Sequence, residues 1–206
     1  MNRDAMPHRT LALAAALLLA ACQGQTSAAP AGPSTDGVDL RGAAIGGPFE
    51  LVDKTGKTVR WSDFQGKYRI VYFGYAYCPD VCPTDVQRFS QGHRIFAREN
   101  PALAKQVQPI FITVDPERDT PAKVGEFAAA FSPELIGLTG TPEQVEAAKS
   151  AFKVSATRGE VQPGGGYLVN HTNLTYLFDP AGKPLGTLPT DKGPEAVAAE
   201  LARWVR

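Results

Sequence analysis

Hydrophobic and polar positions divide the chain into three parts of unequal length. Residues 11–21 form an unbroken apolar run near the N-terminus. Residues 23–36 are rich in Ala, Gly, Pro, Ser and Thr and have almost no large apolar side chains. From Val38 onward, apolar segments with the periodicity of strands and helices follow one another to the C-terminus. We therefore expect one folded domain over residues 38–206, preceded by a segment that lacks a core of its own.

Within this domain, strands and helices alternate along most of the sequence. Residues 68–75 are β-branched, aromatic and mostly apolar, which is typical of a central strand covered on both faces. Further strands are predicted at residues 49–52, 57–60, 107–114, 135–138 and 184–188, with one strand or two over residues 167–178. Helices are predicted at residues 61–66, 84–99, 120–131, 141–152 and 194–205. This order predicts an α/β domain of three layers with an extra N-terminal β-hairpin.

Two stretches after residue 140 carry local signals of opposite kinds. Thr141-Pro142-Glu143-Gln144 combines a capping box with proline at the first helical position, so a helix is expected to begin there. Residues 154–166 are rich in glycine and lack any periodicity. We expect them to form a long loop, and long loops in compact domains are often functional.

The N-terminal apolar run has the features of a bacterial lipoprotein signal. Basic residues precede it, and it is shorter than the roughly 20 apolar residues needed to span a bilayer. It ends in Leu19-Ala20-Ala21-Cys22, and small residues before a cysteine resemble a lipobox, in which Cys22 is acylated. The alternative is an ordinary cleaved signal followed by a cysteine without a role.

The predicted organisation is a signal peptide at residues 1–21, a lipidated Cys22 with a flexible linker up to residue 37, and a domain at residues 38–206. Cleavage before Cys22 leaves 185 residues, which is enough for one domain with a core. The linker composition suits a spacer that holds the domain off a membrane. Lys and Arg number 21, as do Asp and Glu, so we expect no basic face and no nucleic-acid partner.

Two of the three cysteines remain once Cys22 is assigned to lipid. Cys78 and Cys82 have three residues between them and come directly after the strand at residues 68–75. An exported protein can keep disulfides, but closing so small a loop stabilises a fold little, so we expect the pair to carry chemistry. Cys82 is predicted at the N-cap of the next helix, where free N–H groups and the helix dipole favour a thiolate. The carboxylate of Asp80 opposes a second anion there.

Two thiolates so close together can chelate one soft metal ion or oxidise to a disulfide. Both methionines belong to the predicted signal peptide, so the domain has no thioether ligand. Its histidines are His93 and His171. His93 falls in the middle of a predicted helix, where we expect it to be solvated. His171 follows the predicted long loop and is the better candidate. For His171 the alternative is a half-buried histidine with satisfied hydrogen bonds.

A ligand set of two cysteines and one histidine suits copper(I). Zinc is the main rival, because closely spaced cysteines also bind zinc. A structural zinc site needs four ligands, usually as two close pairs, and His93 and His171 are not a close pair. Copper is therefore the metal that the donor set favours.

Three motifs resemble those of the Sco (SenC/PrrC) family and occur in the family's order. The segment FGYAYCPDVCP at residues 73–83 resembles its metal-binding loop. VDPERDT at residues 114–120 resembles its second motif, and YLVNHT at residues 167–172 resembles its histidine motif. The similarity extends from about residue 45 to the C-terminus.

The resemblance implies a thioredoxin-like fold and one copper ion per chain, as Cu(I) and also Cu(II), bound by Cys78, Cys82 and His171. It further implies a metallochaperone that helps to assemble the dinuclear copper centre of cytochrome c oxidase, by delivering copper, by reducing the target's cysteines, or by both. The implied partners are the copper-bearing subunit of the oxidase and other periplasmic copper chaperones or thioredoxin-like reductants. The implied location is the periplasmic side of the cytoplasmic membrane, anchored through Cys22, with the outer membrane as the alternative.

Asn170 departs from the family, which usually has aspartate before the histidine. If that residue supports the ring, the amide would make His171 a weaker donor or disfavour copper(II). The charged residues of the second motif, at positions 115–119, are interpreted as a helix-entry turn with Thr120 as its cap. A contact with a partner protein is the alternative for them.

A thiol–disulfide oxidoreductase without a stably bound metal is the competing function, with Cys78 and Cys82 as its redox-active pair. Thioredoxin-like enzymes usually have two residues between their cysteines, and this loop has three. They also have a proline directly before the strand that faces the cysteines, where this chain has two glycines before Tyr167. A thiol peroxidase would need Thr or Ser three residues before the reactive cysteine, and Tyr75 stands there. We therefore expect a metallochaperone whose only enzyme-like activity is thiol reduction of a dedicated partner.

Overall fold

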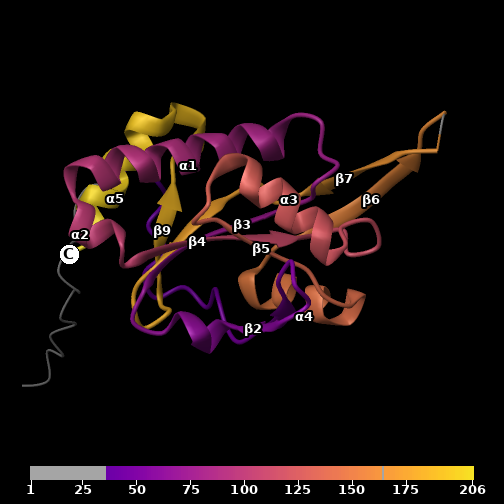
Figure 1. The fold of residues 1–206 in the computed structure, drawn as a ribbon, viewed down its shortest axis with the longest axis horizontal. Helices are drawn as coiled ribbons and strands as arrows, with labels where there is room; N and C mark the ends of the chain where they lie inside the picture. Colours follow the sequence, from indigo (N-terminus) through magenta and orange to yellow (C-terminus); the bar gives the residue numbers. More distant parts are fainter. Residues whose placement is uncertain (1–35, 164) are drawn as a thin grey trace, which may run out of the picture. The chain divides into compact units, whose positions relative to one another are not determined.

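The computed structural model describes residues 36–163 and 165–206 (Figure 1). The predicted signal peptide, the predicted lipid attachment at Cys22 and nearly all of the predicted linker lie outside these residues. No helix in the described ranges combines the length and the apolar character that crossing a bilayer requires.

A five-stranded sheet in the order β5-β4-β3-β8-β9 forms the middle layer. Its parallel strands are β3 (Tyr68–Gly74), β4 (Val107–Thr113) and β5 (Ile136–Leu138). Its antiparallel strands are β8 (Thr175–Phe178) and β9 (Pro184–Leu188). All seven residues of β3 are buried, which confirms the predicted central strand and explains why its sequence lacks a polar face.

Helices cover both faces of this sheet (Figure 1). One face carries α1 (Val81–Glu99), α3 (Pro121–Phe131) and α5 (Pro194–Trp204), and the other carries α4 (Pro142–Phe152). The hairpin of β1 (Glu50–Val52) and β2 (Thr58–Arg60) lies on the same side as α4. Short helical segments occur at α2 (Pro101–Ala104), η1 (Trp61–Phe64) and η2 (Thr190–Lys192). The predicted three-layer α/β architecture with its N-terminal hairpin is confirmed.

Alternation along β3 divides the core into two halves. The Tyr72 ring faces α1, where its centroid lies 6.1 Å from that of Phe89 and 6.4 Å from that of Phe111. The next residue, Phe73, faces α4, where it lies 5.3 Å from Phe152. Successive side chains of a strand point to opposite faces, so neighbouring residues of β3 contribute to both halves of the core.

The register of β3 against β4 determines where two of the motifs meet. Gly74, the last residue of β3, pairs with Thr113, the last residue of β4. The cysteine loop (residues 75–82) and residues 114–120 therefore leave the sheet side by side. They do so at the carboxyl ends of parallel strands, where open α/β sheets bind their ligands.

A separate two-stranded sheet, the β6–β7 hairpin, consists of β6 (Ala156–Val161) and β7 (Tyr167–His171) and projects beyond the helical layers (Figure 1). The prediction of a long loop over residues 154–166 is wrong, because β6 occupies its middle. Most residues of β6 are exposed, so the strand needs no alternation of apolar and polar positions, and its sequence shows none. β7 and β8 are separate, so residues 167–178 contain two strands.

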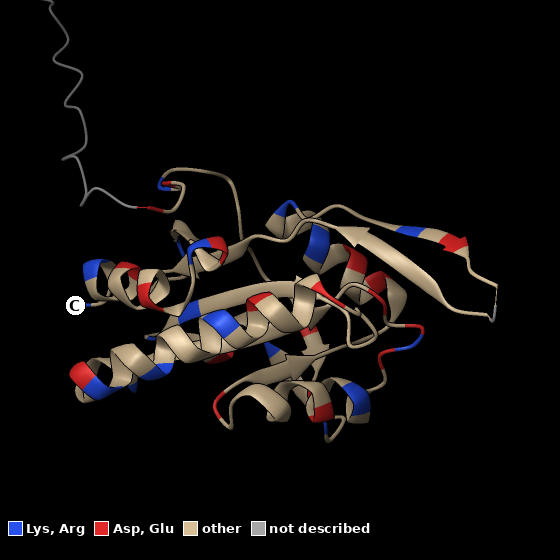
Figure 2. Cartoon of the chain, turned by 90° about the horizontal axis from the view of Figure 1, so that it is seen from above, with Lys and Arg blue, Asp and Glu red and all other residues tan. Residues whose placement is uncertain are grey.

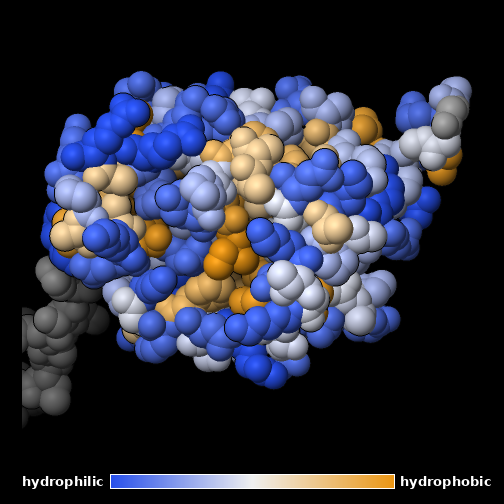
Figure 3. All heavy atoms as spheres, in the orientation of Figure 1, coloured by the Kyte–Doolittle hydropathy of each residue, from blue (hydrophilic) through white to orange (hydrophobic). Residues whose placement is uncertain are grey.

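Lys and Arg are interspersed with Asp and Glu along the described elements (Figure 2). Figure 3 shows one face that is largely hydrophilic, with apolar atoms gathered over the edge strand β5. Among the described residues, most of the large apolar side chains that are exposed belong to the cysteine loop, to the β6–β7 hairpin or to the residues just after it. These are Tyr77, Val81, Val161, Leu168 and Leu174.

Candidate metal centre

The cysteine loop joins the end of β3 to the first turn of α1. Cys78 is half-buried and Cys82 is fully buried, and both are free thiols. α1 begins at Val81 with Asp80 as its N-cap, so the prediction that Cys82 caps this helix is wrong. Cys82 lies in the first turn, and its backbone N–H donates to Cys78 Sγ at 3.4 Å. The unpaired N–H groups of the helix start therefore serve Cys78.

Gly74 makes room for the buried thiol at the end of β3. A Cβ atom on this residue would lie 3.1 Å from Cys82 Sγ, 2.9 Å from Tyr72 Cε1 and 3.0 Å from Phe111 Cε2. Contacts that short would force the sulfur or the two rings to move. Glycine is therefore required here by two aromatic rings of β3 and β4 and by the Cys82 sulfur of α1, although its backbone conformation is ordinary.

His171 is the last residue of β7 and meets a cysteine that lies 89 residues earlier in the sequence. Its Nε2 atom lies 3.2 Å from Cys82 Sγ. Its Nδ1 atom lies 2.9 Å from the carbonyl oxygen of Thr172, which can only accept a hydrogen bond. Nδ1 therefore carries the ring proton, which leaves the lone pair of Nε2 on the side of the cysteines.

Asn170 does not support the histidine ring. It is exposed, and the partner of His171 Nδ1 is the backbone of Thr172. The tautomer of His171 therefore depends on the backbone that follows it. The predicted weakening of His171 assumes that residue 170 supports the ring. In the structure the carbonyl oxygen of Thr172 has that position instead.

The two thiols differ in pKa because one stabilises the charge of the other. The hydrogen bond that the Cys82 side chain donates lowers the pKa of Cys78 to about 3, against the effect of burial, and the His171 side chain and the backbone N–H groups of Asp80 and Cys82 assist. The same hydrogen bond, together with burial, raises the pKa of Cys82. Cys78 is therefore the thiolate and Cys82 the thiol, the reverse of the prediction from an N-cap position for Cys82.

Asp119 ties the cysteine loop to the end of β4. The residue is fully buried, and its Oδ2 atom accepts hydrogen bonds from the Ala76 N–H at 2.9 Å and the Thr113 hydroxyl at 2.6 Å. The predicted helix-entry turn is confirmed at Thr120, whose side chain accepts from the Lys123 N–H. The role of Asp119 was missed by sequence reasoning. The available signal was a carboxylate just beyond the end of a strand that neighbours the cysteine strand.

Two segments, the cysteine loop and β7, thus bring together the three predicted ligands Cys78, Cys82 and His171. Within the described part of the chain, no group of three His, Cys, Asp or Glu side chains already has the spacing of a metal site. The three side chains are nevertheless neighbours, because Cys82 Sγ lies 3.2 Å from His171 Nε2 and Cys78 interacts with the side chains of both Cys82 and His171. Loss of its proton would leave two thiolate sulfurs and one imidazole nitrogen as neighbours, which is a donor set for a soft cation.

His93 does not join this group. It lies in α1 and is buried, so the prediction of a solvated position is wrong. Burial lowers its pKa and keeps the ring neutral, and the backbone of Ala104 in α2 is its hydrogen-bonding neighbour. Helical periodicity places His93 on the side of α1 that faces α2. The prediction of a solvated position followed the polar character of the side chain and overlooked this periodicity.

Comparison with known proteins gives a consistent set of relatives. The SCO1/SenC family model matches residues 38–206. The protein SenC of Rhodobacter capsulatus is 44% identical over 163 residues, which is 79% of this chain and 71% of that protein. The mitochondrial SCO1 homolog of Homo sapiens is 35% identical over 162 residues, or 79% of this chain and 53% of that protein. The chain thus spans about half the length of the human relative.

A solved structure gives the corresponding result for the fold. ScoI of Bradyrhizobium japonicum, solved with copper bound, is 39% identical and superimposes with a TM-score of 0.71. The match covers 79% of this chain and 100% of that one. The predicted thioredoxin-like fold is confirmed by this similarity.

Proposed function

The chain belongs to the SCO1/SenC family, and on this premise we propose that it is a copper metallochaperone for the dinuclear copper centre of cytochrome c oxidase. It binds one copper ion per chain through Cys78, Cys82 and His171. The observation that carries the proposal is the convergence of these three side chains at the carboxyl end of β3. The ion is cargo that the protein takes up and gives away.

The chemistry of the donors favours copper(I) over its rivals. Two thiolate sulfurs and one neutral imidazole nitrogen suit a soft monovalent ion in a three-coordinate site. Zinc would call for a fourth protein ligand, and in the described residues His93 points into the core instead. The copper bound by ScoI of Bradyrhizobium japonicum supports the same choice.

The oxidase as target follows from the family. A more distant member, BsSco, is described as belonging to the Sco family of cytochrome c oxidase assembly proteins. At 23% identity, its similarity to this chain concerns the fold. Because the chain belongs to the SCO1/SenC family, the copper-bearing subunit of the oxidase is the proposed partner, with periplasmic copper chaperones or thioredoxin-like reductants upstream.

Reduction of the target's cysteines is a second function that one observation favours. Cys78 is partly exposed and ionised, as an attacking thiol must be. Cys82 is buried and protonated, which suits a resolving thiol that reacts second. Cys78 would attack one sulfur of a target disulfide and release the other as a thiol. Cys82 would then displace the reduced target and form a disulfide with Cys78, so two electrons pass to the target.

The proposed location is the periplasmic side of the cytoplasmic membrane. A signal peptide at residues 1–21 and acylation of Cys22 would deliver and anchor the chain. Residues 23–37 would then act as the spacer between the lipid and the domain.

Replacement of the histidine tests the proposed site. We expect His171→Ala to weaken copper(I) binding by more than the roughly 10- to 100-fold that loss of an outer-shell partner costs, because a direct ligand is removed. Competition titration against a copper(I) chelator measures the affinity, and the copper(II) absorption spectrum reports the loss of the nitrogen ligand.

The neighbouring variant Asn170→Ala is the matched control, since that side chain is exposed, and it should bind copper as the wild type does. Unchanged affinity and unchanged copper(II) spectra in His171→Ala would remove His171 from the site. A wild-type chain that binds no copper would overturn the metallochaperone proposal.

A further inference from the structure

Arg118 lies between the two segments that carry the proposed ligands. Its side chain is only 22% exposed, and its Nε atom pairs with Asp115 Oδ2 at 2.5 Å. Its Nη1 atom donates to the carbonyl oxygen of Tyr167, the first residue of β7, at 2.9 Å. Asp115 Oδ1 in turn accepts from the Tyr167 hydroxyl at 2.8 Å. The Arg118–Asp115 pair therefore holds Tyr167 by its backbone and by its side chain.

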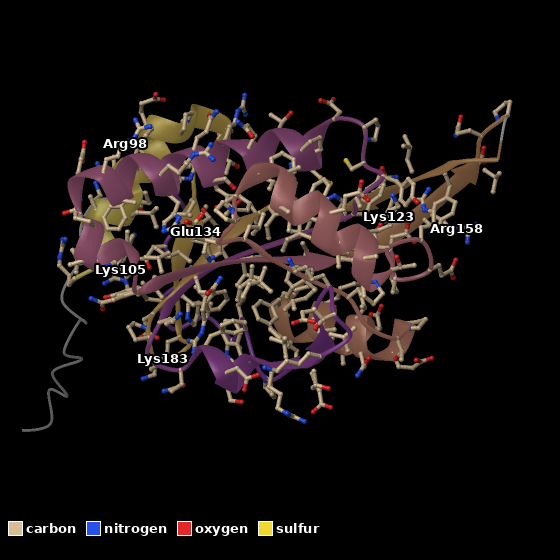
Figure 4. All side chains as sticks on the ribbon, in the orientation of Figure 1. Arg98, Lys105, Lys123, Glu134, Arg158 and Lys183 are labelled. Atoms are coloured by element: carbon tan, nitrogen blue, oxygen red, sulfur yellow. The ribbon has the colours of Figure 1, made fainter. Side chains whose placement is uncertain are left out.

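The Tyr167 ring is also held by two guanidinium groups. Arg118 Cζ lies 3.5 Å from the ring centroid, and Arg158 Cζ, from β6, lies 3.7 Å from it. Two planar cations this close to one centroid cannot share a face of the ring, so they stack on opposite faces. Arg158 is labelled on β6 in Figure 4, and it also pairs with Glu117 at 3.1 Å. The half-exposed Arg158 lies on the outer side of this stack, whereas Arg118 is enclosed.

Arg118 also reaches the cysteine loop. Its Cζ atom lies 5.6 Å from the centroid of the Tyr75 ring and 5.3 Å from that of Tyr77. The Tyr75 hydroxyl accepts a hydrogen bond from the Val169 N–H of β7 at 3.2 Å, and its ring lies 5.9 Å from that of His171. One guanidinium thus contacts aromatic residues on both sides of the gap between the cysteines and the histidine.

The attachment of the β6–β7 hairpin makes this contact important. Its two strands pair only with each other among the described strands, and the five-stranded sheet does not include them. Backbone hydrogen bonds of a sheet therefore do not hold β7 against β3, although residues 172–174 tie its end at His171 to β8, which pairs with β3. The rest of the hairpin depends on side-chain contacts, and those of Arg118 act at Tyr167, the first residue of β7 and the end away from this tie.

We propose that Arg118 is a positioning residue that fixes the β6–β7 hairpin against the cysteine loop and so sets the distance of His171 from Cys78 and Cys82. The inference rests on the proposed copper site. A guanidinium is needed because one planar group must stack on Tyr167, bond its carbonyl and pair with Asp115 at the same time. The point charge of lysine keeps the ion pair with Asp115 and loses the rest.

The test compares Arg118→Lys with the same replacement at the other face of the ring, Arg158→Lys, in the full-length chain. Hydrogen exchange of the metal-free proteins reports the attachment of the hairpin, at the Val169 amide in particular. Competition titration reports copper(I) affinity, and nitrogen hyperfine coupling in the copper(II) spectrum reports ligation by His171. Urea unfolding checks that each variant is folded.

We expect Arg118→Lys to exchange the β7 amides faster, to bind copper(I) about 10- to 100-fold more weakly and to lose nitrogen coupling. Arg158→Lys should stay within about twofold of wild type, because its contacts are on the solvent side. Equal affinity in Arg118→Lys and wild type, or equal losses in both variants, would overturn the inference alone. A wild type without copper binding would overturn the proposed function and the inference together. Arg118→Gln provides the same comparison should the lysine variant fail to fold.

Discussion

Cys78 and Cys82 have the same side chain and opposite environments. The half-buried Cys78 receives the backbone N–H of Cys82 at the start of α1, and the buried Cys82 thiol stabilises its charge. Burial next to an existing anion keeps Cys82 protonated. At the scale of single residues, the difference between an accessible thiolate and an enclosed thiol comes first from the hydrogen bond between the two side chains and then from the deeper burial of Cys82.

This asymmetry predicts selective alkylation of the reduced, metal-free protein. The pKa of Cys78 is lowered to about 3, so its thiolate persists as the pH falls from about 8 to about 5, and its rate of reaction with iodoacetamide should stay nearly constant. An ordinary cysteine loses roughly 1,000-fold in thiolate over that interval. Peptide mass spectrometry gives the rate at each cysteine, and Cys82 should remain protected.

The urea-unfolded chain is the control, since both cysteines should then react with the pH dependence of a free thiol. A Cys78 rate in the folded protein that falls in step with that of the unfolded chain would show that the hydrogen bonds around Cys78 do not lower its pKa.

At the scale of elements, a helix cap could be predicted from local sequence, whereas an exposed strand could not. The capping box of α4 is present as predicted, because the Thr141 side chain accepts from the Gln144 N–H at 3.3 Å and Gln144 Oε1 accepts from the Thr141 N–H at 2.9 Å. These bonds need only residues of one turn. The exposed strand β6 was missed because it has neither a buried face nor a periodic pattern.

Loss of the α4 cap should destabilise the domain without changing its chemistry. We expect Thr141→Ala to lower the free energy of unfolding by about 1 kcal/mol, since the first turn of the helix loses the partner of a backbone N–H group. Urea denaturation measures this change. Thr141→Ser keeps the hydroxyl and should recover most of it, and copper affinity should match the wild type in both because α4 supplies no ligand. A Thr141→Ala chain as stable as the wild type would argue against the cap.

At the scale of the whole molecule, the proposed anchor and the proposed copper site belong to different parts of the chain. The described domain contains all three proposed ligands, while Cys22 lies outside the described residues. The exposed side chains of Tyr77, Val81 and Leu168 lie within three residues of a proposed ligand in sequence. Exposed apolar side chains around a site suit one that a partner protein must cover while copper is transferred.

Because the proposed anchor and the proposed copper site lie in different parts of the chain, we expect that each can be lost without the other. In a strain that carries only the variant, we expect Cys78→Ser to abolish copper binding and maturation of cytochrome c oxidase, because two soft donors become one. Cys22→Ser should leave copper binding intact and move the chain from the membrane to the soluble periplasmic fraction. Oxidase activity in isolated membranes and cell fractionation measure the two effects.

Normal oxidase assembly in the Cys78→Ser strain would contradict the chaperone function. Membrane retention of Cys22→Ser would contradict the lipid anchor and leave the copper site unaffected, so each outcome concerns one part of the proposal.

The sequence by itself determined the layered α/β architecture, the buried strand β3 and the α4 cap, and it proposed two cysteines and one histidine as the metal ligands. Such features depend on periodicity, on neighbouring residues or on residue type, which a single chain displays directly. Only the tertiary structure decided that His171 meets Cys82 across 89 residues, that Cys78 is the thiolate, and that Asp119 and Arg118 hold the ligand segments. These outcomes depend on strand register and on a hairpin held by side chains, and no local pattern encodes contacts between segments so far apart in sequence.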